Sequence, residues 1–389
     1  MDNKSVVSLA IESTSPSQAT LMKTEPLVSI IINNYNYDRF LAEAINSALN
    51  QTYRKIEVIV VDDGSIDNSH KIIASYGSRI IPVLKSNAGQ ASSFNEGIKV
   101  SQGKIISFLD SDDLFHPDKV EKIVDFFIQK DLIDSSTIFF NSFKAINEKG
   151  LSVDDVTPSK VYSDWSKLAK IRGDHYVGGD HYFFNGEINK VCTPEQVYDF
   201  ASKYRYIPYI GMPSSSTSMS HTLAHRVFPL PINSYRTCAD NIMVKAASLL
   251  GSTYSTDLAL TQYRLHGNNT WFGQKQTREI EEATCLMPDT YLNSKLEEIG
   301  RKPVLSFLKS MPACGFYSCY FGYNAANQLI KLAFDVVMFR LDIETCVFFV
   351  KTLTRGIYYK LRGCLKGVTA SNIVSKIPLR PSFWGRHRE

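Results

Sequence analysis

The chain has 389 residues, of which 44% are apolar and 21% are charged, with 21 glycines and 15 prolines. This composition excludes a disordered, collagen-like or low-complexity protein and leaves a packed globular one. The balance of 43 basic against 39 acidic residues is too even to indicate nucleic acid as the main partner.

Residues 1–25 are polar and rich in Ser, Thr and Asn, which predicts a flexible leader. They lack the basic cluster and the apolar run of a secretory signal. The seven cysteines are odd in number, widely spaced and without a C-x-x-C pair, so neither a disulfide framework nor a zinc site is indicated. The longest apolar tract, residues 329–350, carries five charges and is not expected to span a membrane. We therefore expect a cytoplasmic protein.

From Pro26 onward, apolar strands alternate with helical stretches. Strands are predicted over 28–32, 57–61, 80–84 and 105–109, and helices over 40–49, 67–76, 91–100 and 117–129. Short, nearly continuous β-branched runs are typical of strands buried on both faces, which means a parallel sheet covered by helices. Residues 26–130 are thus expected to form a Rossmann-like α/β half that binds ligands at the carboxyl ends of its strands.

The pattern is less regular over residues 131–275, where we expect a strand at 137–143, aromatic-rich loops, and a helix at 241–250. Residues 276–389 read as a helical extension. Its last 39 residues hold nine Lys or Arg against one acid, Glu389, a local net charge of +8. The extension could lie on an anionic membrane surface as amphipathic helices, or pack on the preceding domain as a helical cap with a solvated basic face.

Polar residues follow each of the four predicted parallel strands. They are Asn33-Asn34-Tyr35-Asn36, Asp62-Asp63-Gly64-Ser65, Ser86-Asn87-Ala88-Gly89 and Asp110-Ser111-Asp112-Asp113. Alternating carboxylates such as Asp110 and Asp112 can chelate a hard divalent cation, although a solvated acidic loop with Asp113 capping the next helix is the plainer interpretation of an isolated motif. Asp63 can accept a hydrogen bond from a ring N–H such as uracil N3, or it can simply belong to a helix-capping turn.

Taken together, these motifs resemble the nucleotide-binding half of the family 2 glycosyltransferases, which share the GT-A fold. The resemblance is carried by Val28 to Asn36, Ala44 to Tyr53, Val61 to Ser65, Asn87 with Gly89, Asn95-Glu96-Gly97, Gly103, and Phe108 to Asp113. It implies a Rossmann-like, mixed and mostly parallel sheet flanked by helices, with the C-terminal helical extension appended. One departure is Asn33-Asn34, where the family usually has Pro-Thr or Pro-Ala in the segment that lines the base pocket.

The resemblance also implies roles for individual residues. Asp63 would hold the nucleotide base, Asn34 and Tyr35 would line its pocket, Asp110 would contact the ribose or the metal shell, and Asp112 would be the principal metal ligand. The remaining nucleotide-sugar contacts are expected among the other motif residues, namely Asn36, Asn87, Gly89 and Ser111.

The second half of the resemblance is looser and covers the acceptor side. Thr237-Cys238-Ala239-Asp240-Asn241 matches a segment in which the family carries an acidic pair, and Asp240 is the surviving second acid. Asp240 would be the general base, or else an ordinary helix N-cap. Ser214 to Ser220 resembles the segment that faces the donor sugar. His266 would complete the metal shell or be merely structural, and Arg264 would meet the diphosphate.

The implied activity is inverting transfer of a hexosyl or N-acetylhexosaminyl group from a nucleotide diphosphate sugar, with UDP as the expected nucleotide, to an acceptor hydroxyl. Mn²⁺ or Mg²⁺ is the implied cofactor. A saccharide or lipid-linked saccharide acceptor in cell-surface polysaccharide or glycolipid synthesis is implied, with peripheral association at the inner face of the cell membrane. The alternative is a catalytically degenerate nucleotide-sugar-binding protein on the same fold. The chain lacks the Gly-rich motifs expected of a nucleotidyltransferase or a dinucleotide-dependent oxidoreductase.

Overall fold

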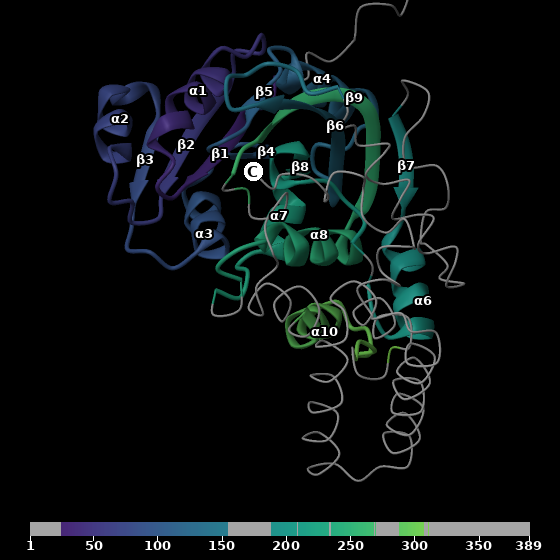
Figure 1. Cartoon of the computed structure of the whole chain (residues 1–389). Coiled ribbons are helices and arrows are strands. Elements are labelled where there is room, and N and C mark those ends of the chain that lie inside the picture. The colour runs from purple at the N-terminus through teal and green to yellow at the C-terminus, as the bar shows by residue number, and fades with distance from the viewer. Residues whose placement is uncertain are drawn as a thin grey trace, which may run out of the picture.

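The computed structural model describes residues 25–154, 188–207, 209–232, 235–267, 269, 288–306 and 310. Its strands are β1 (Val28–Asn34), β2 (Ile56–Asp62), β3 (Ile81–Leu84), β4 (Ile105–Asp110), β5 (Leu114–Phe115), β6 (Thr137–Asn147), β7 (Ile188–Cys192), β8 (Thr217–Ser220) and β9 (Ser252–Leu265). They form one sheet in the order β3-β2-β1-β4-β8-β6-β9-β5, and β7 pairs with β9 outside this row (Figure 1).

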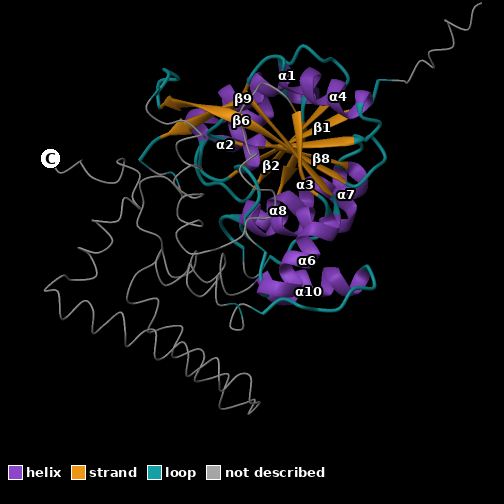
Figure 2. Ribbon diagram, turned by 90° about the vertical axis from the view of Figure 1, so that its right-hand side faces the viewer, coloured by secondary structure: helices purple, strands orange, loops and turns teal. Residues whose placement is uncertain are grey.

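Helices cover both faces of this sheet, as Figure 2 shows from the side. The helices are α1 (Asp38–Leu49), α2 (Ser69–Ser75), α3 (Gln90–Val100), α4 (Lys119–Gln129), α6 (Pro194–Tyr204), α7 (His221–Val227), α8 (Ala239–Leu250) and α10 (Pro288–Glu298), with 3-10 turns η1 (Gly77–Arg79) and η2 (Ser214–Ser216). Among the described residues, no helix is long and apolar enough to cross a membrane.

The first four long strands run parallel, as the sequence predicts. β1 pairs with β2 on one side and with β4 on the other, in registers that set Asn34 beside Asp62 and Asn33 beside Asp110. β2 pairs in parallel with β3. The polar residues after these strands therefore meet at one edge of the sheet, where ligands bind in open α/β folds.

Beyond β4 the sheet is mixed. β8 lies antiparallel between β4 and β6, and β9 runs parallel to β6. The small-residue segment Ser214 to Ser220, for which the sequence suggested no strand, is therefore a 3-10 turn followed by a central strand. Its short side chains suit this position because β8 is packed on both sides and all four of its residues are buried.

Two apolar layers hold the helices on the sheet. Alternate residues of β1 enter opposite layers: Ile30 and Ile32 pack with α1 and α4, whereas Ile31 packs with α3 and α8. All three isoleucines are fully buried, and each such side chain contributes about 1.5–3 kcal/mol to folding. α8 is apolar around most of its surface because α6 and α10 pack against it on the side away from the sheet (Figure 1).

The predicted C-terminal extension is described only in part. α10 is helical, as expected for this region. Residues 270–287, 307–309 and 311–389 lie outside the described residues, as do residues 1–24. The leader, the basic tail and the choice between a membrane-surface segment and a helical cap therefore stay predictions.

Candidate active site

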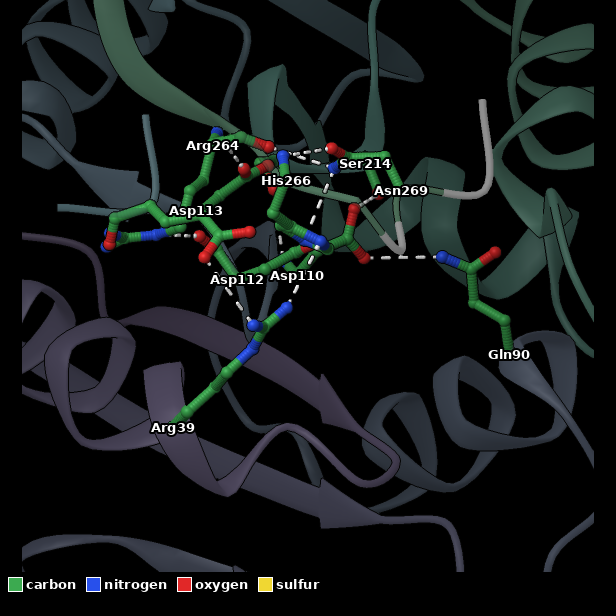
Figure 3. Close-up of polar contacts among 11 residues, drawn as sticks. Arg39, Gln90, Asp110, Asp112, Asp113, Ser214, Arg264, His266 and Asn269 are labelled. Atoms are coloured by element: carbon green, nitrogen blue, oxygen red, sulfur yellow. Dashed lines mark hydrogen bonds and ion pairs between the residues drawn. The ribbon is translucent and has the colours of Figure 1, made fainter. Parts of the chain in front are cut away.

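The carboxylate motif lies at the end of the central strand β4. Asp110 is the last residue of the strand and Asp113 donates its backbone N–H to the Asp110 carbonyl at 3.0 Å, which closes a tight turn. Ser111 is 3% exposed and points away from solvent. Asp112, at the tip of the turn, keeps 17% of its side chain exposed. The turn thus presents Asp110 and Asp112 at the edge where β1 and β4 end (Figure 3).

These carboxylates concentrate negative charge in a poorly solvated place. Burial, together with the charge of Asp112, raises the pKa of Asp110 to about 7. Burial and the charges of Asp112 and Asp110 also raise the pKa of Asp113. Such shifts mark a site where a cation would relieve the repulsion.

Three hydrogen bonds hold Asp110 in place. The Ser215 hydroxyl accepts its backbone N–H at 2.9 Å, the Ser214 hydroxyl donates to Oδ2, and the Gln90 side chain donates from Nε2 to Oδ1 at 3.2 Å. Ser214 lies within the segment that the resemblance assigns to the donor side, whereas the sequence contained no signal that singled out Gln90.

His266 stands beside Asp112, as the resemblance implies for a shared metal. Its Nε2 is 2.9 Å from Asp112 Oδ2, its side chain is fully buried, and the rings of Tyr37 and Phe40 pack against it. The His266 Nδ1 lies 3.4 Å from Nη2 of Arg39, which is on α1 (Figure 3).

Asp112, Asp110 and His266 supply ligand types that Mn²⁺ or Mg²⁺ accepts. Carboxylates with an imidazole suit Mn²⁺, and Mg²⁺ is usually held by one or two carboxylates plus substrate phosphates rather than by a full protein cage. In the described part of the chain, no three His, Cys, Asp or Glu side chains lie where they could hold a metal ion together, so a cation here would need further ligands such as substrate phosphates.

Arg264 occupies a different place from the one that the resemblance suggests. Its side chain is fully buried, and its guanidinium donates to the carbonyl of Asp112 at 2.8 Å, to the carbonyl of Glu148 at 3.0 Å and to Glu43 Oε2 at 2.7 Å. Its backbone N–H donates to Asp113 Oδ1 at 2.8 Å. These bonds engage all three guanidinium nitrogens: Nε holds the acidic turn through Asp112, and the other two bind Glu148 and Glu43. In this structure Arg264 therefore supports Asp112 from below.

Asp63, the carboxylate expected to hold the nucleotide base, lies between β2 and the loop before α3. It is only 3% exposed. Its Oδ1 accepts from the Ala88 N–H at 2.9 Å and from the Lys85 ammonium, and its Oδ2 accepts from the Gly89 N–H at 2.7 Å. A carboxylate has about four acceptor positions, so it has room for one more donor such as a base N–H.

The other predicted pocket residues separate into buried and exposed ones. Asn34 is 2% exposed and donates to Asp62 Oδ2 at 2.8 Å, so it secures β1 to β2. Tyr35 is 45% exposed, and Asn36, also exposed, holds the left-handed turn after β1 with a φ of 59°. Asn87 accepts from the guanidinium of Arg236.

On the acceptor side, Asp240 sits in the first turn of α8. Burial raises the pKa of Asp240 to about 6, although nearby donors, including the Tyr209 hydroxyl at 3.2 Å from Oδ2, oppose the rise. The N-cap of α8 is Cys238 and not Asp240. A carboxylate with a pKa near 6 is suited to accept a proton near neutral pH.

This fold and this site define a class. A mixed sheet whose central parallel strand leads into Asp-Ser-Asp, with a base-side carboxylate after β2, two strands away, and a further carboxylate across the edge, is the arrangement of the GT-A glycosyltransferases. Residues 29–186 match the family model described as Glycosyl transferase family 2. This match confirms the resemblance to that family found in the sequence.

The chain is similar to two uncharacterized bacterial glycosyltransferases and to a solved structure. An uncharacterized glycosyltransferase of Nostoc sp. is 29% identical over 281 residues, which are 70% of this chain and 76% of that protein. An uncharacterized glycosyltransferase of Rickettsia conorii is 45% identical over 137 residues, but the match spans 35% of this chain and 22% of that protein. Among solved structures, S. aureus TarS 1–349 aligns with a TM-score of 0.49 at 14% identity, over 78% of this chain and 80% of that one.

Proposed function

We propose that this glycosyltransferase moves a sugar from a nucleotide diphosphate sugar to an acceptor hydroxyl with inversion, using a divalent cation and Asp240 as the general base. The observation that carries the proposal is the pair of carboxylate groups on opposite sides of one edge. Asp110 ends β4 and Asp112 lies in the turn that follows, whereas Asp240 is the second residue of α8. The repulsion between Asp240 and Asp110 contributes to the raised pKa of Asp110.

The donor half of the proposal rests on the residues after the parallel strands. Asp63 would accept a base N–H, which favours a uridine nucleotide, and exposed Tyr35 would cover the base. Asp112 and His266, with Asp110, would hold Mn²⁺ or Mg²⁺. When bound, the cation would neutralise the charge that develops on the departing diphosphate.

The acceptor half rests on Asp240. A buried carboxylate whose pKa is about 6 is ionised at neutral pH and basic enough to take a hydroxyl proton as the new bond forms. Tyr209 orients its Oδ2. Attack from this side, opposite the diphosphate, would invert the anomeric carbon in a single displacement without a covalent enzyme intermediate.

A degenerate binding protein is the second candidate, favoured by Ala239 in place of the first acid of the family pair. Ala239 is fully buried and its backbone N–H is bonded to Gln90 Oε1 at 2.8 Å, so this position serves the packing of α8. The retained Asp240 with its raised pKa supports an enzyme. The proposal also names the transferred group, the acceptor and the location. The group is hexosyl or N-acetylhexosaminyl, the acceptor is a cell-surface saccharide or a lipid-linked saccharide, and the protein associates peripherally with the inner membrane face.

The test is release of nucleoside diphosphate from a panel of UDP-, GDP- and dTDP-sugars, with Mn²⁺, Mg²⁺ or EDTA. We expect slow, cation-dependent hydrolysis of one donor, lost in Asp112→Ala and in Asp240→Asn. Asp134→Asn is the matched control, because this carboxylate is 77% exposed and pairs with Lys104 away from the site. Binding of a donor without any release by the native chain would support the degenerate protein instead.

A further inference from the structure

Gln90 connects the two sides of the candidate site with the two ends of one side-chain amide. Its Nε2 donates to Asp110 Oδ1 at 3.2 Å, and its Oε1 accepts the backbone N–H of Ala239 at 2.8 Å. Asp110 ends the central strand, and Ala239 is the first residue of α8, directly before Asp240. Figure 3 shows Gln90 reaching Asp110 from the side opposite Arg39.

The orientation of this amide follows from its partners. A backbone N–H can only donate, so the amide oxygen must face Ala239, and the NH₂ group is left to face the carboxylate. A carboxylate, an aliphatic chain or a shorter amide in place of Gln90 would lose at least one of the two bonds. The bridge is therefore specific for glutamine in length and in polarity.

The backbone around Gln90 is clamped to the same segment. The N–H groups of Gln90 and Ala91 donate to the carbonyls of Arg236 at 2.8 Å and Tyr235 at 3.2 Å. The preceding residue is Gly89 with a φ of 92°, and a Cβ there would lie 2.3 Å from the Arg236 Cα. The start of α3 thus has little freedom to move relative to the segment that leads into α8.

We propose that Gln90 is a positioning residue that sets the separation between the donor-side carboxylate Asp110 and the acceptor-side carboxylate Asp240. The inference rests on the proposed function. In transfer reactions the rate depends steeply on how the reacting groups are placed, and a displacement of about 1 Å can cost on the order of 100-fold. Gln90 does not touch the reacting atoms; it acts through the two carboxylates.

The experiment compares the full-length native chain with Gln90→Met and Gln90→Glu. Methionine keeps the length and volume of the side chain without its hydrogen bonds. Glutamate keeps an acceptor for the Ala239 N–H but sets a like charge against Asp110. Ser93→Ala is the matched control in the same turn of α3, because within the described part of the chain the Ser93 hydroxyl bonds only to the Gly89 carbonyl, at 3.3 Å.

Three measurements are made: the kinetics of diphosphate release from the donor that the native chain hydrolyses, which give kcat and donor KM; the Kd for UDP in EDTA; and Tm. We expect kcat to fall by roughly 10- to 100-fold in both Gln90 variants. The metal-free UDP Kd and the donor KM should stay within about 3-fold, since the base-side contacts of Asp63 are untouched. Ser93→Ala should resemble the native chain in all three.

The outcomes separate this inference from the proposed function. If the native chain hydrolyses a donor and Gln90→Met keeps its kcat, the inference alone is overturned. Full activity in Gln90→Glu would also overturn it, because the bond to Asp110 would then be dispensable. If kcat falls only in proportion to the fraction of folded protein, as judged from Tm, the inference is also overturned, because Gln90 then has only a packing role. A native chain inactive on every donor overturns both.

Discussion

Replacing Asp110 with asparagine should stabilise the metal-free protein while it removes activity. Burial and the charge of Asp112 raise the pKa of Asp110 from 3.8 to about 7, roughly three units, each of which corresponds to about 1.4 kcal/mol. Ionised Asp110 therefore costs about 4 kcal/mol of stability above pH 7. Asparagine carries no charge, but its hydrogen bonds with Ser214 and Gln90 are weaker than those of a carboxylate, by about 1 kcal/mol each.

The net expectation is a gain of about 2 kcal/mol at pH 8, or about 4–8 °C in Tm for a domain of this size. The gain should depend on pH. Because the folded-state pKa is raised, the protonated native chain is favoured at low pH and loses stability as the pH rises through the window from about 4 to about 7. The difference between Asp110→Asn and the native chain should therefore vanish near pH 4 and level off above pH 7.

The assay is thermal unfolding in EDTA between pH 4 and pH 8.5, with Asp134→Asn as the control for loss of an exposed carboxylate. A surface change of that kind should alter stability by less than about 0.5 kcal/mol at any pH. Lower stability of Asp110→Asn at pH 8, or an equal gain at pH 4 and pH 8, would refute the reasoning. Mn²⁺ should stabilise the native chain more than the variant, which keeps Asp112 and His266 but lacks the Asp110 carboxylate.

Three further predictions concern other parts of the site. Asp240→Asn should lower diphosphate release by about 10²–10⁴-fold, and the native rate should rise with pH through about 6, because the base must be ionised. Gly89→Ala should lower Tm far more than Gly77→Ala: both have positive φ, but only at Gly89 would a Cβ collide with backbone. Arg264→Met should lower the free energy of unfolding in urea by about 1–3 kcal/mol, because the Asp112 and Glu148 carbonyls and the half-exposed Glu43 carboxylate lose their donor, whereas exposed Arg39→Met should change it little.

The sequence predicted that Asp63 and Asp110 lie at one edge of the sheet, because their positions depend on local pattern. The parallel strands have continuous β-branched runs, and each motif directly follows its strand, so Asp63 and Asp110 needed only the rule that such strands end at one edge. The contacts that join distant segments across the site could not be predicted from the sequence. Gln90 and Ala239 are 149 positions apart, and nothing in the local pattern around either one indicates the other.

The position of Arg264 also depends on contacts that are distant in the sequence. An arginine in a basic segment can face a ligand or be buried, and the sequence alone does not distinguish the two. Its burial follows from β9, a 14-residue strand that brings Arg264 under the acidic turn next to Glu43. The pairing of β9 with β6 and β5 determines that position, and such long-range register has no short-range signature.

The position of β8 has a consequence for how the protein is made. This strand inserts between β4 and β6 although it is synthesised after both. While the ribosome is translating residues 111–216, the nascent chain already contains β4, whose edge has no β8 to pair with. During synthesis this apolar strand is open to pairing with other chains. A fragment that stops before Thr217 should therefore aggregate. In a chain that folds correctly, the edge of β4 must be kept from pairing with other chains until β8 has been synthesised.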